Sequence, residues 1–74
     1  MLRLYPVESS VVASLGYDDE SQTLFVRFHG SGSSYLYEGV NQATLDELIE
    51  SDSIGSYVNR VIKPRHKGRK LKAS

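Results

Sequence analysis

Hydrophobic and polar residues alternate with a period of two in three segments of the first half of the chain. The first runs over residues 11–17, the second over 24–29 and the third over 35–38. Alternation of this kind is typical of strands with one buried face. Polar or glycine-rich stretches at 18–22 and 30–34 separate the segments, and short loops of this composition favour hairpins. The pattern therefore predicts a three-stranded antiparallel meander.

The hydrophobic period changes to that of a helix after Val40. Asn41 is a suitable N-cap, because its side-chain oxygen can accept a hydrogen bond from an unpaired N–H of the first turn. Leu45, Leu48 and Ile49 then follow at helical spacing, and Ser53 offers a second cap. The apolar positions after this second cap fit another helical stripe: Ile54, Tyr57, Val58, Val61 and Ile62. Pro64 is expected to end that helix.

These elements predict an α+β fold for residues 1–63, in which two short helices pack on one face of a three-stranded antiparallel meander. The side chains expected to form the core on that face are Val11, Ala13, Leu15, Tyr17, Leu24, Val26, Phe28, Tyr35 and Tyr37. The opposite face carries Val12, Phe25, Arg27, His29, Leu36 and Glu38. That set is too apolar for a surface that only contacts water, so we expect a partner there.

Length and composition exclude several classes of protein. A chain of 74 residues holds one domain. It has no cysteine, hence no disulfide or thiolate metal site, and its two histidines lack metal-ligand spacing. No stretch approaches the ~20 apolar residues of a membrane span, and the first residues do not resemble a secretory signal. We expect a cytoplasmic protein with no bound metal, no cofactor and no membrane contact.

The net charge of zero hides a strong segregation along the chain. Residues 60–74 contain seven lysines and arginines and no acid, whereas residues 1–59 contain two arginines and nine acids. The end of the chain, 64–74, lacks hydrophobic periodicity and is expected to be a flexible basic tail. Such a tail can follow a phosphate backbone, but it can also serve solubility, pair with the acidic body, or bind an acidic protein.

An ordered set of short motifs resembles the KTSC domain, a small family named for its place at the C-terminus of some lysyl-tRNA synthetases. The matching segments are Val7-Glu8-Ser9-Ser10, Gly16-Tyr17-Asp18, residues 24–28, Tyr35-Leu36-Tyr37, and residues 53–59 with their Ser-x-Gly-x-Tyr-x-Asn pattern. Members also occur as stand-alone bacterial or phage-type proteins. The resemblance suggests RNA binding, an inference drawn largely from the attachment to a tRNA synthetase.

The first functional hypothesis is a module for RNA or single-stranded nucleic acid. Its candidate residues combine one aromatic ring with cationic side chains: Phe25, Arg27, His29, Lys63, Arg65, Lys67, Arg69, Lys70 and Lys72. Aromatic rings interleaved with cations on an open sheet are typical of single-strand binders. Tyr35 and Tyr37 are either further stacking residues or members of the core, and their parity favours the core.

Two other hypotheses remain open. Val12, Phe25 and Leu36 could instead form the face of a homodimer or of an inhibitor-like adaptor. The cationic residues also permit capture of a small anionic ligand, such as a nucleotide, between two protomers. Catalysis is not expected, because no serine has a base at a fixed local offset. The cluster Asp18-Asp19-Glu20 is interpreted as a turn, since it lacks the spacing of a calcium loop.

Overall fold

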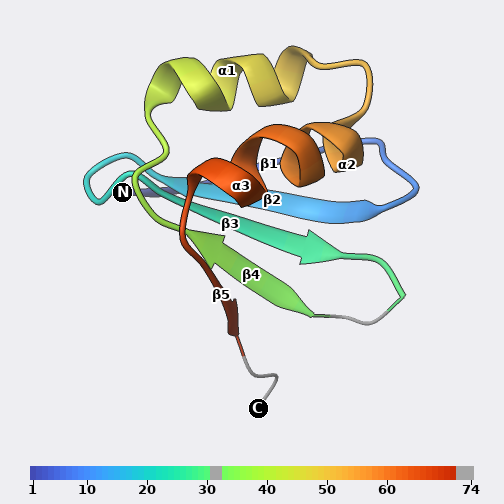
Figure 1. Cartoon of the computed structure of the whole chain (residues 1–74), viewed down its shortest axis with the longest axis horizontal. Coiled ribbons are helices and arrows are strands. Elements are labelled where there is room, and N and C mark those ends of the chain that lie inside the picture. Colours follow the sequence, from blue (N-terminus) through green and yellow to red (C-terminus); the bar gives the residue numbers. More distant parts are fainter. Residues whose placement is uncertain (31–32, 72–74) are drawn as a thin grey trace.

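The computed structural model describes residues 1–30 and 33–71 of the chain (Figure 1). Five strands form one antiparallel sheet whose spatial order equals their order in the sequence. They are β1 (Leu2–Tyr5), β2 (Val12–Asp18), β3 (Thr23–Phe28), β4 (Ser34–Tyr37) and β5 (Gly68–Leu71). Strands β1 and β5 are the two edges of this sheet.

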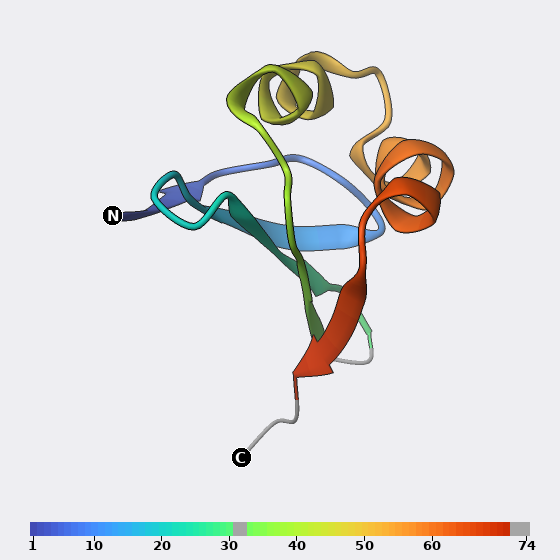
Figure 2. The same cartoon turned by 60° about the vertical axis from the view of Figure 1, so that its left-hand side comes forward.

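Two helical segments cover one face of the sheet and leave the other face bare (Figure 2). The first is α1 (Gln42–Glu50), and the second runs without a break through α2 (Ile54–Tyr57), the π-helical turn η1 (Val58–Ile62) and α3 (Lys63–Arg65). Both predicted caps are confirmed. The Asn41 side chain accepts a hydrogen bond from the Thr44 N–H at 2.9 Å, and the Ser53 hydroxyl accepts one from the Ser56 N–H at 3.3 Å.

The α+β class is confirmed, but the predicted number of three strands is wrong because both edge strands were missed. β5 lies within residues 64–74, which were expected to form a flexible tail. The second helix also continues past Pro64 to Arg65, where it was expected to end. A turn then carries the chain back to the sheet, and residues 68–71 pair with β4. Lys72 lies outside the described residues.

A bulge near the start of β2 corrects the predicted core. Val12 pairs with Phe28 and Ser14 pairs with Arg27, so Ala13 is an extra residue between two consecutive rungs. An extra residue of this kind reverses the faces of the residues before it. Val12, expected on the bare face, is therefore fully buried, and Val11, expected in the core, is 45% exposed. Val12 cannot contribute to a dimer face.

The core lies between the sheet and the two helical segments. Its buried side chains are Val12, Leu15, Tyr17, Leu24, Val26, Tyr37, Val40, Leu45, Leu48, Ile54, Val58 and Ile62. The Tyr17 hydroxyl donates a hydrogen bond to the Val40 carbonyl, and the Val40 N–H donates to the Gln22 carbonyl at 2.9 Å. These bonds satisfy polar groups that burial would otherwise penalise. Burial also raises the pKa of the Tyr17 phenol.

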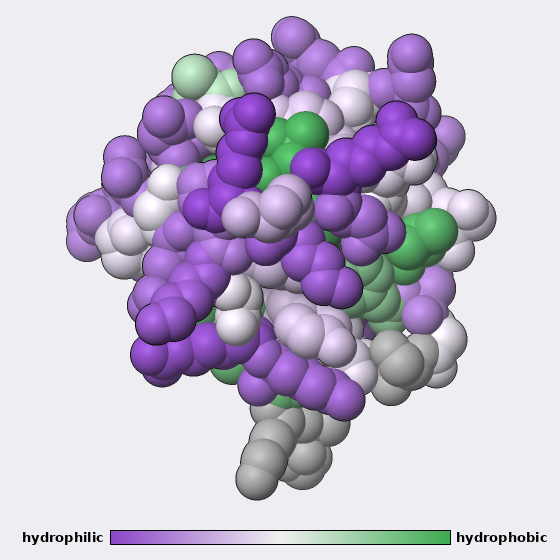
Figure 3. Space-filling view, in the orientation of Figure 1, coloured by the Kyte–Doolittle hydropathy of each residue, from purple (hydrophilic) through white to green (hydrophobic). Residues whose placement is uncertain are grey.

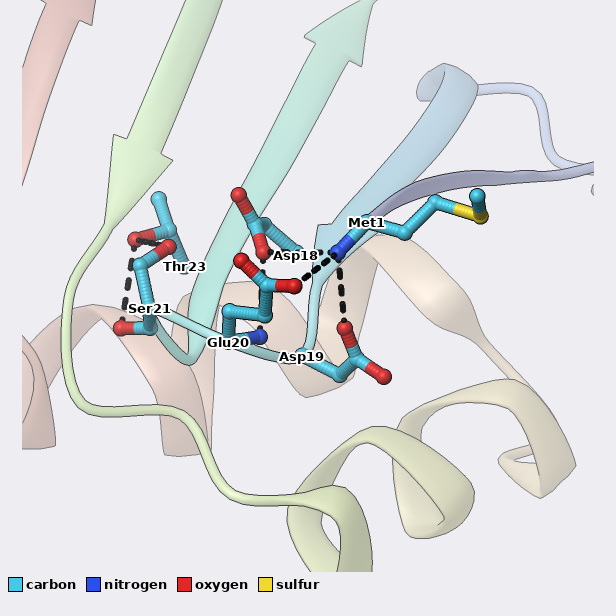
Figure 4. A network of polar contacts seen from close by, with 6 residues as sticks. All are labelled: Met1, Asp18, Asp19, Glu20, Ser21 and Thr23. Atoms are coloured by element: carbon cyan, nitrogen blue, oxygen red, sulfur yellow. Dashed lines mark hydrogen bonds and ion pairs between the residues drawn. The ribbon is translucent and has the colours of Figure 1, made fainter.

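The turn between β2 and β3 is acidic and is closed by the N-terminal amine (Figure 4). That amine lies 3.0 Å from a carboxylate oxygen of Asp19, 3.5 Å from Asp18 and 3.6 Å from Glu20. Asp18 also accepts a hydrogen bond from the Glu20 N–H, which is the leading reason for its lowered pKa. These contacts support the interpretation of this cluster as a turn. In the described part of the chain, no helix is long and apolar enough to cross a membrane.

Candidate nucleic-acid interface

The bare face of the sheet brings together side chains from all five strands, and we call it the outer face. One row of paired residues crosses it: Leu4, Gly16, Phe25, Leu36 and Arg69. The next row on this face contains Ser14, Arg27, Ser34 and Leu71. Directly paired residues of antiparallel strands point to the same side of the sheet. The register therefore places Arg27 beside Phe25 on one strand and Arg69 in the same row as Phe25, with Leu36 between them.

A shallow hollow of about 240 Å³ lies on this face. Leu2, Leu4, Phe25, Arg27 and Leu71 contribute to its lining. Gly16 also lines the hollow, and an ideal Cβ at Gly16 would lie 3.3 Å from a methyl carbon of Leu4. The leucines of β1 remain accessible, with Leu2 54% and Leu4 77% exposed. The outer face is thus apolar at Leu4, Phe25 and Leu36, with Arg69 at the end of that row and Arg27 in the next.

The end of the outer face near the β3–β4 loop is polar. A second depression, of about 430 Å³, is lined there by Ala13, Ser14, Arg27, Phe28, His29 and Gly30. His29 is exposed, and its backbone N–H donates to the Val11 carbonyl at 2.9 Å. The acidic turn lies at the opposite end of β3. Along β3, the charge therefore changes from the acidic turn at one end to Arg27 near the loop at the other.

The remaining candidate lysines and arginines do not lie together on the outer face. Lys63 contributes to a cleft on the helical side, and Lys70 pairs with Tyr35, whose parity is that of the core. Arg65 lies on the helical layer, where its charge lowers the pKa of Tyr57, although burial and Glu47 raise that pKa more. Lys67 lies in the turn before β5, where its carbonyl accepts a hydrogen bond from the Glu38 N–H at 3.3 Å.

The basic residues do not pair with the acidic body in the described structure. Within residues 1–30 and 33–71, the salt bridges all involve the N-terminal amine, and none joins a lysine or arginine of residues 60–71 to a carboxylate. The basic segment is instead held in the second helical segment up to Arg65 and by the backbone pairing of strand β5 over residues 68–71. Its side chains are exposed, so their charges remain available to an external anion.

Tyr35 and Tyr37 lie on the helical side of the sheet and not on the outer face. Tyr37 is 3% exposed, and burial raises the pKa of its phenol. Tyr35 is partly buried, and its ring contacts that of Phe28 edge to face, with centroids 5.5 Å apart. Tyr37 is therefore a core residue, and Tyr35 lies at the boundary between the core and solvent. Neither can stack on a ligand bound to the outer face.

The hydroxyl groups of Ser9 and Ser53 have structural roles. The Ser9 hydroxyl accepts hydrogen bonds from the N–H groups of Val11 and Val12, both at 3.1 Å. Ser53 caps the second helical segment. Each hydroxyl thus satisfies backbone donors in the segment that leads into β2 or α2.

Sequence reasoning missed Leu2, Leu4 and Leu71 as parts of the outer face, and Asn59 as part of the helical-side cleft. A signal for the first two was present, because Leu2 and Leu4 alternate with Arg3 and Tyr5 as in a strand. Nothing similar marks Leu71. Its place follows only from the pairing of β5 with β4.

The molecule is, by its fold, a small α+β domain with one helix-covered and one bare sheet face. The sequence profile of the KTSC domain matches residues 8–66. A protein of Tsukamurella paurometabola is 44% identical over 62 residues, which cover 84% of this chain and 91% of the relative. An uncharacterized protein of Stutzerimonas stutzeri is 47% identical over 60 residues, which cover 81% and 83%.

A solved structure agrees with these sequence matches. The crystal structure of a KTSC domain protein from Yersinia pestis superposes with a TM-score of 0.87 at 30% identity, covering 97% of this chain and 100% of that one. The chain belongs to the KTSC domain family. The resemblance predicted from the short motifs is therefore confirmed.

Gly68 provides a test of how β5 is held. An ideal Cβ at this position would lie 2.6 Å from Cε1 of Tyr37, whose buried ring has little room to move. We expect Gly68→Ala to lower the free energy of unfolding by about 1–3 kcal/mol, as overpacking does. Urea unfolding measures the change. Lys70→Ala, on the same strand but exposed, should change it by less than about 0.5 kcal/mol. Equal stability of the two variants would contradict this packing.

Proposed function

We propose that the protein is a non-catalytic module that binds RNA or other single-stranded nucleic acid on its outer face. The observation that carries the proposal is the position of Phe25 on an open sheet face, with Arg27 beside it and Arg69 in its cross-strand row. Phe25 supplies a ring on which a base can stack, and the two guanidinium groups supply phosphate contacts.

Elementary chemistry favours this ligand for this surface. Bases stack on aromatic side chains without regard to their identity, and cations in the path of the backbone release counterions. The apolar hollow beside Phe25 can cover part of a second base or a sugar. The resulting binding would depend strongly on salt and weakly on sequence. His29 lines the depression next to the β3–β4 loop and would add a polar contact at that end of the face.

The stacking role is tested by Phe25→Leu, which keeps an apolar side chain in the sheet but removes the ring. We expect it to weaken binding of a fluorescein-labelled oligouridylate by about 5- to 150-fold, the value of one stacked base. Fluorescence anisotropy measures the affinity. Ile49→Ala, at an exposed apolar position on α1, is the control and should bind as the unmodified protein does. An affinity unchanged by Phe25→Leu would contradict the stacking role.

The phosphate role is tested by a pair of variants with the same change in charge. Arg69→Ala removes a cation from the outer face, and Arg65→Ala removes one from the helical layer. The slope of log affinity against log salt should become shallower by about 0.7 for Arg69→Ala, the value of one phosphate contact with a single strand. Arg65→Ala should leave the slope unchanged. Equal effects would indicate attraction by net charge and not binding at the outer face.

A second candidate function is self-association through the same face, and the exposure of Leu2 and Leu4 favours it. Two large apolar side chains beside a hollow are unusual on the surface of a small monomer. Leu4→Ser should then shift the mass seen by sedimentation equilibrium toward the monomer, whereas Ile49→Ser on α1 should not. A protein that is strictly monomeric at high micromolar concentration has no such function.

A further inference from the structure

A cleft on the helical side of the sheet is separate from the outer face and has the features of a small-molecule site. It encloses about 450 Å³ between η1, α3 and strands β3 to β5. Its lining residues are Val11, Phe28, Tyr35, Tyr37, Asn59, Lys63 and Gly68. We propose that this cleft binds a nucleoside monophosphate, with the base against the aromatic wall and the phosphate at Lys63.

The aromatic wall is held in place before any ligand arrives. Phe28 and Tyr35 pack edge to face at an interplanar angle of 80°, and both lie against the core. The Tyr37 ring is held between the core and Gly68. Because Gly68 has no side chain, the backbone of β5 can pass close to the Tyr37 ring. The partly exposed rings of Phe28 and Tyr35 therefore offer a planar ligand a contact surface at small entropic cost.

Polar groups at the mouth of the cleft have no partner inside the described structure. Asn59 and Lys63 are exposed, and the side chain of neither makes a hydrogen bond or salt bridge there. The same holds for the Tyr37 hydroxyl, which is not a buried unsatisfied group. An amide can pair with the edge of a base, and an ammonium group can bind a phosphate. The lining contains one cation and no acid, which selects an anion.

The helical segment that lines the cleft contains an unusual backbone turn. Residues 58–62 form a π-helical turn, and the Lys63 N–H bonds to the Val58 carbonyl five residues earlier. Turns of this type are rare and occur frequently at functional sites. The wider turn contains Asn59 and immediately precedes Lys63. The turn therefore determines the backbone positions of both polar residues at the mouth of the cleft, Asn59 and Lys63.

The surroundings agree with a ligand of this size and charge. Pockets for small molecules usually enclose about 300–1,000 Å³, and this cleft falls within that range. Lys70 pairs with Tyr35 and so lies on this side of the sheet, where it adds a second positive charge. Seen from the side of Figure 1, the surface is mostly hydrophilic with scattered hydrophobic areas (Figure 3).

The test is a titration of the ¹⁵N-labelled full chain with adenosine monophosphate, followed by NMR. We expect saturable shifts at the amides of Phe28, Tyr35 and Asn59. Lys63→Ala should weaken binding at least about tenfold, the value of a charge-assisted hydrogen bond. Arg60→Ala, an equal loss of charge on the same turn but outside the lining, should leave the affinity within about twofold.

Two further ligands identify what the cleft recognises. Adenosine lacks the phosphate and ribose 5-phosphate lacks the base, so each should bind more weakly than the monophosphate. The proposal is overturned if no saturable shifts appear at millimolar concentration, if ribose 5-phosphate binds as tightly, or if Lys63→Ala and Arg60→Ala behave alike. Shifts confined to Phe25, Arg27 and Arg69 would also overturn it, while leaving the proposed outer-face function intact.

Discussion

The packing of two helical segments against one face of the sheet is the contact on which the rest of the molecule depends. The apolar stripes of α1 and of the segment from α2 to α3 are used on that face, where they bury the inward side chains of β2, β3 and β4. Within residues 1–30 and 33–71, no third helical segment covers the other face. The outer face therefore meets solvent, and its apolar row of Leu4, Phe25 and Leu36 is available to a partner.

Much of this arrangement follows from local patterns in the sequence. The alternation in β2, β3 and β4 predicted the meander, and Asn41 and Ser53 predicted the two helix starts. The parity of Phe25 and Arg27 also predicted their common face, since β3 is regular along its length. These features depend on hydrophobic period and on caps, which single residues and their spacing encode.

The features that could not be predicted depend on pairing between distant segments. Residues 68–71 carry no strand pattern and become a strand only because β4 offers them an unpaired edge. The bulge at Ala13 is equally invisible, and it exchanged the expected positions of Val11 and Val12. The same exchange brings Val11 against Gly55, where an added Cβ would lie 2.9 Å from that of Val11. One extra residue thus affects the core, the approach of α2 and one wall of the cleft.

Strand β5 connects the two candidate surfaces, because its consecutive residues point to opposite sides of the sheet. Arg69 belongs to the outer face and Lys70 to the helical side. A slip of one residue in the pairing would exchange the two cations and remove each from its surface. The Tyr37 ring lies so close to β5 that only glycine fits at the position paired with Tyr37. A strand shifted by one residue would place Lys67 or Arg69 at that position. Gly68 thus fixes the pairing register of β5, and this register decides that Arg69 lies on the outer face and Lys70 on the helical side.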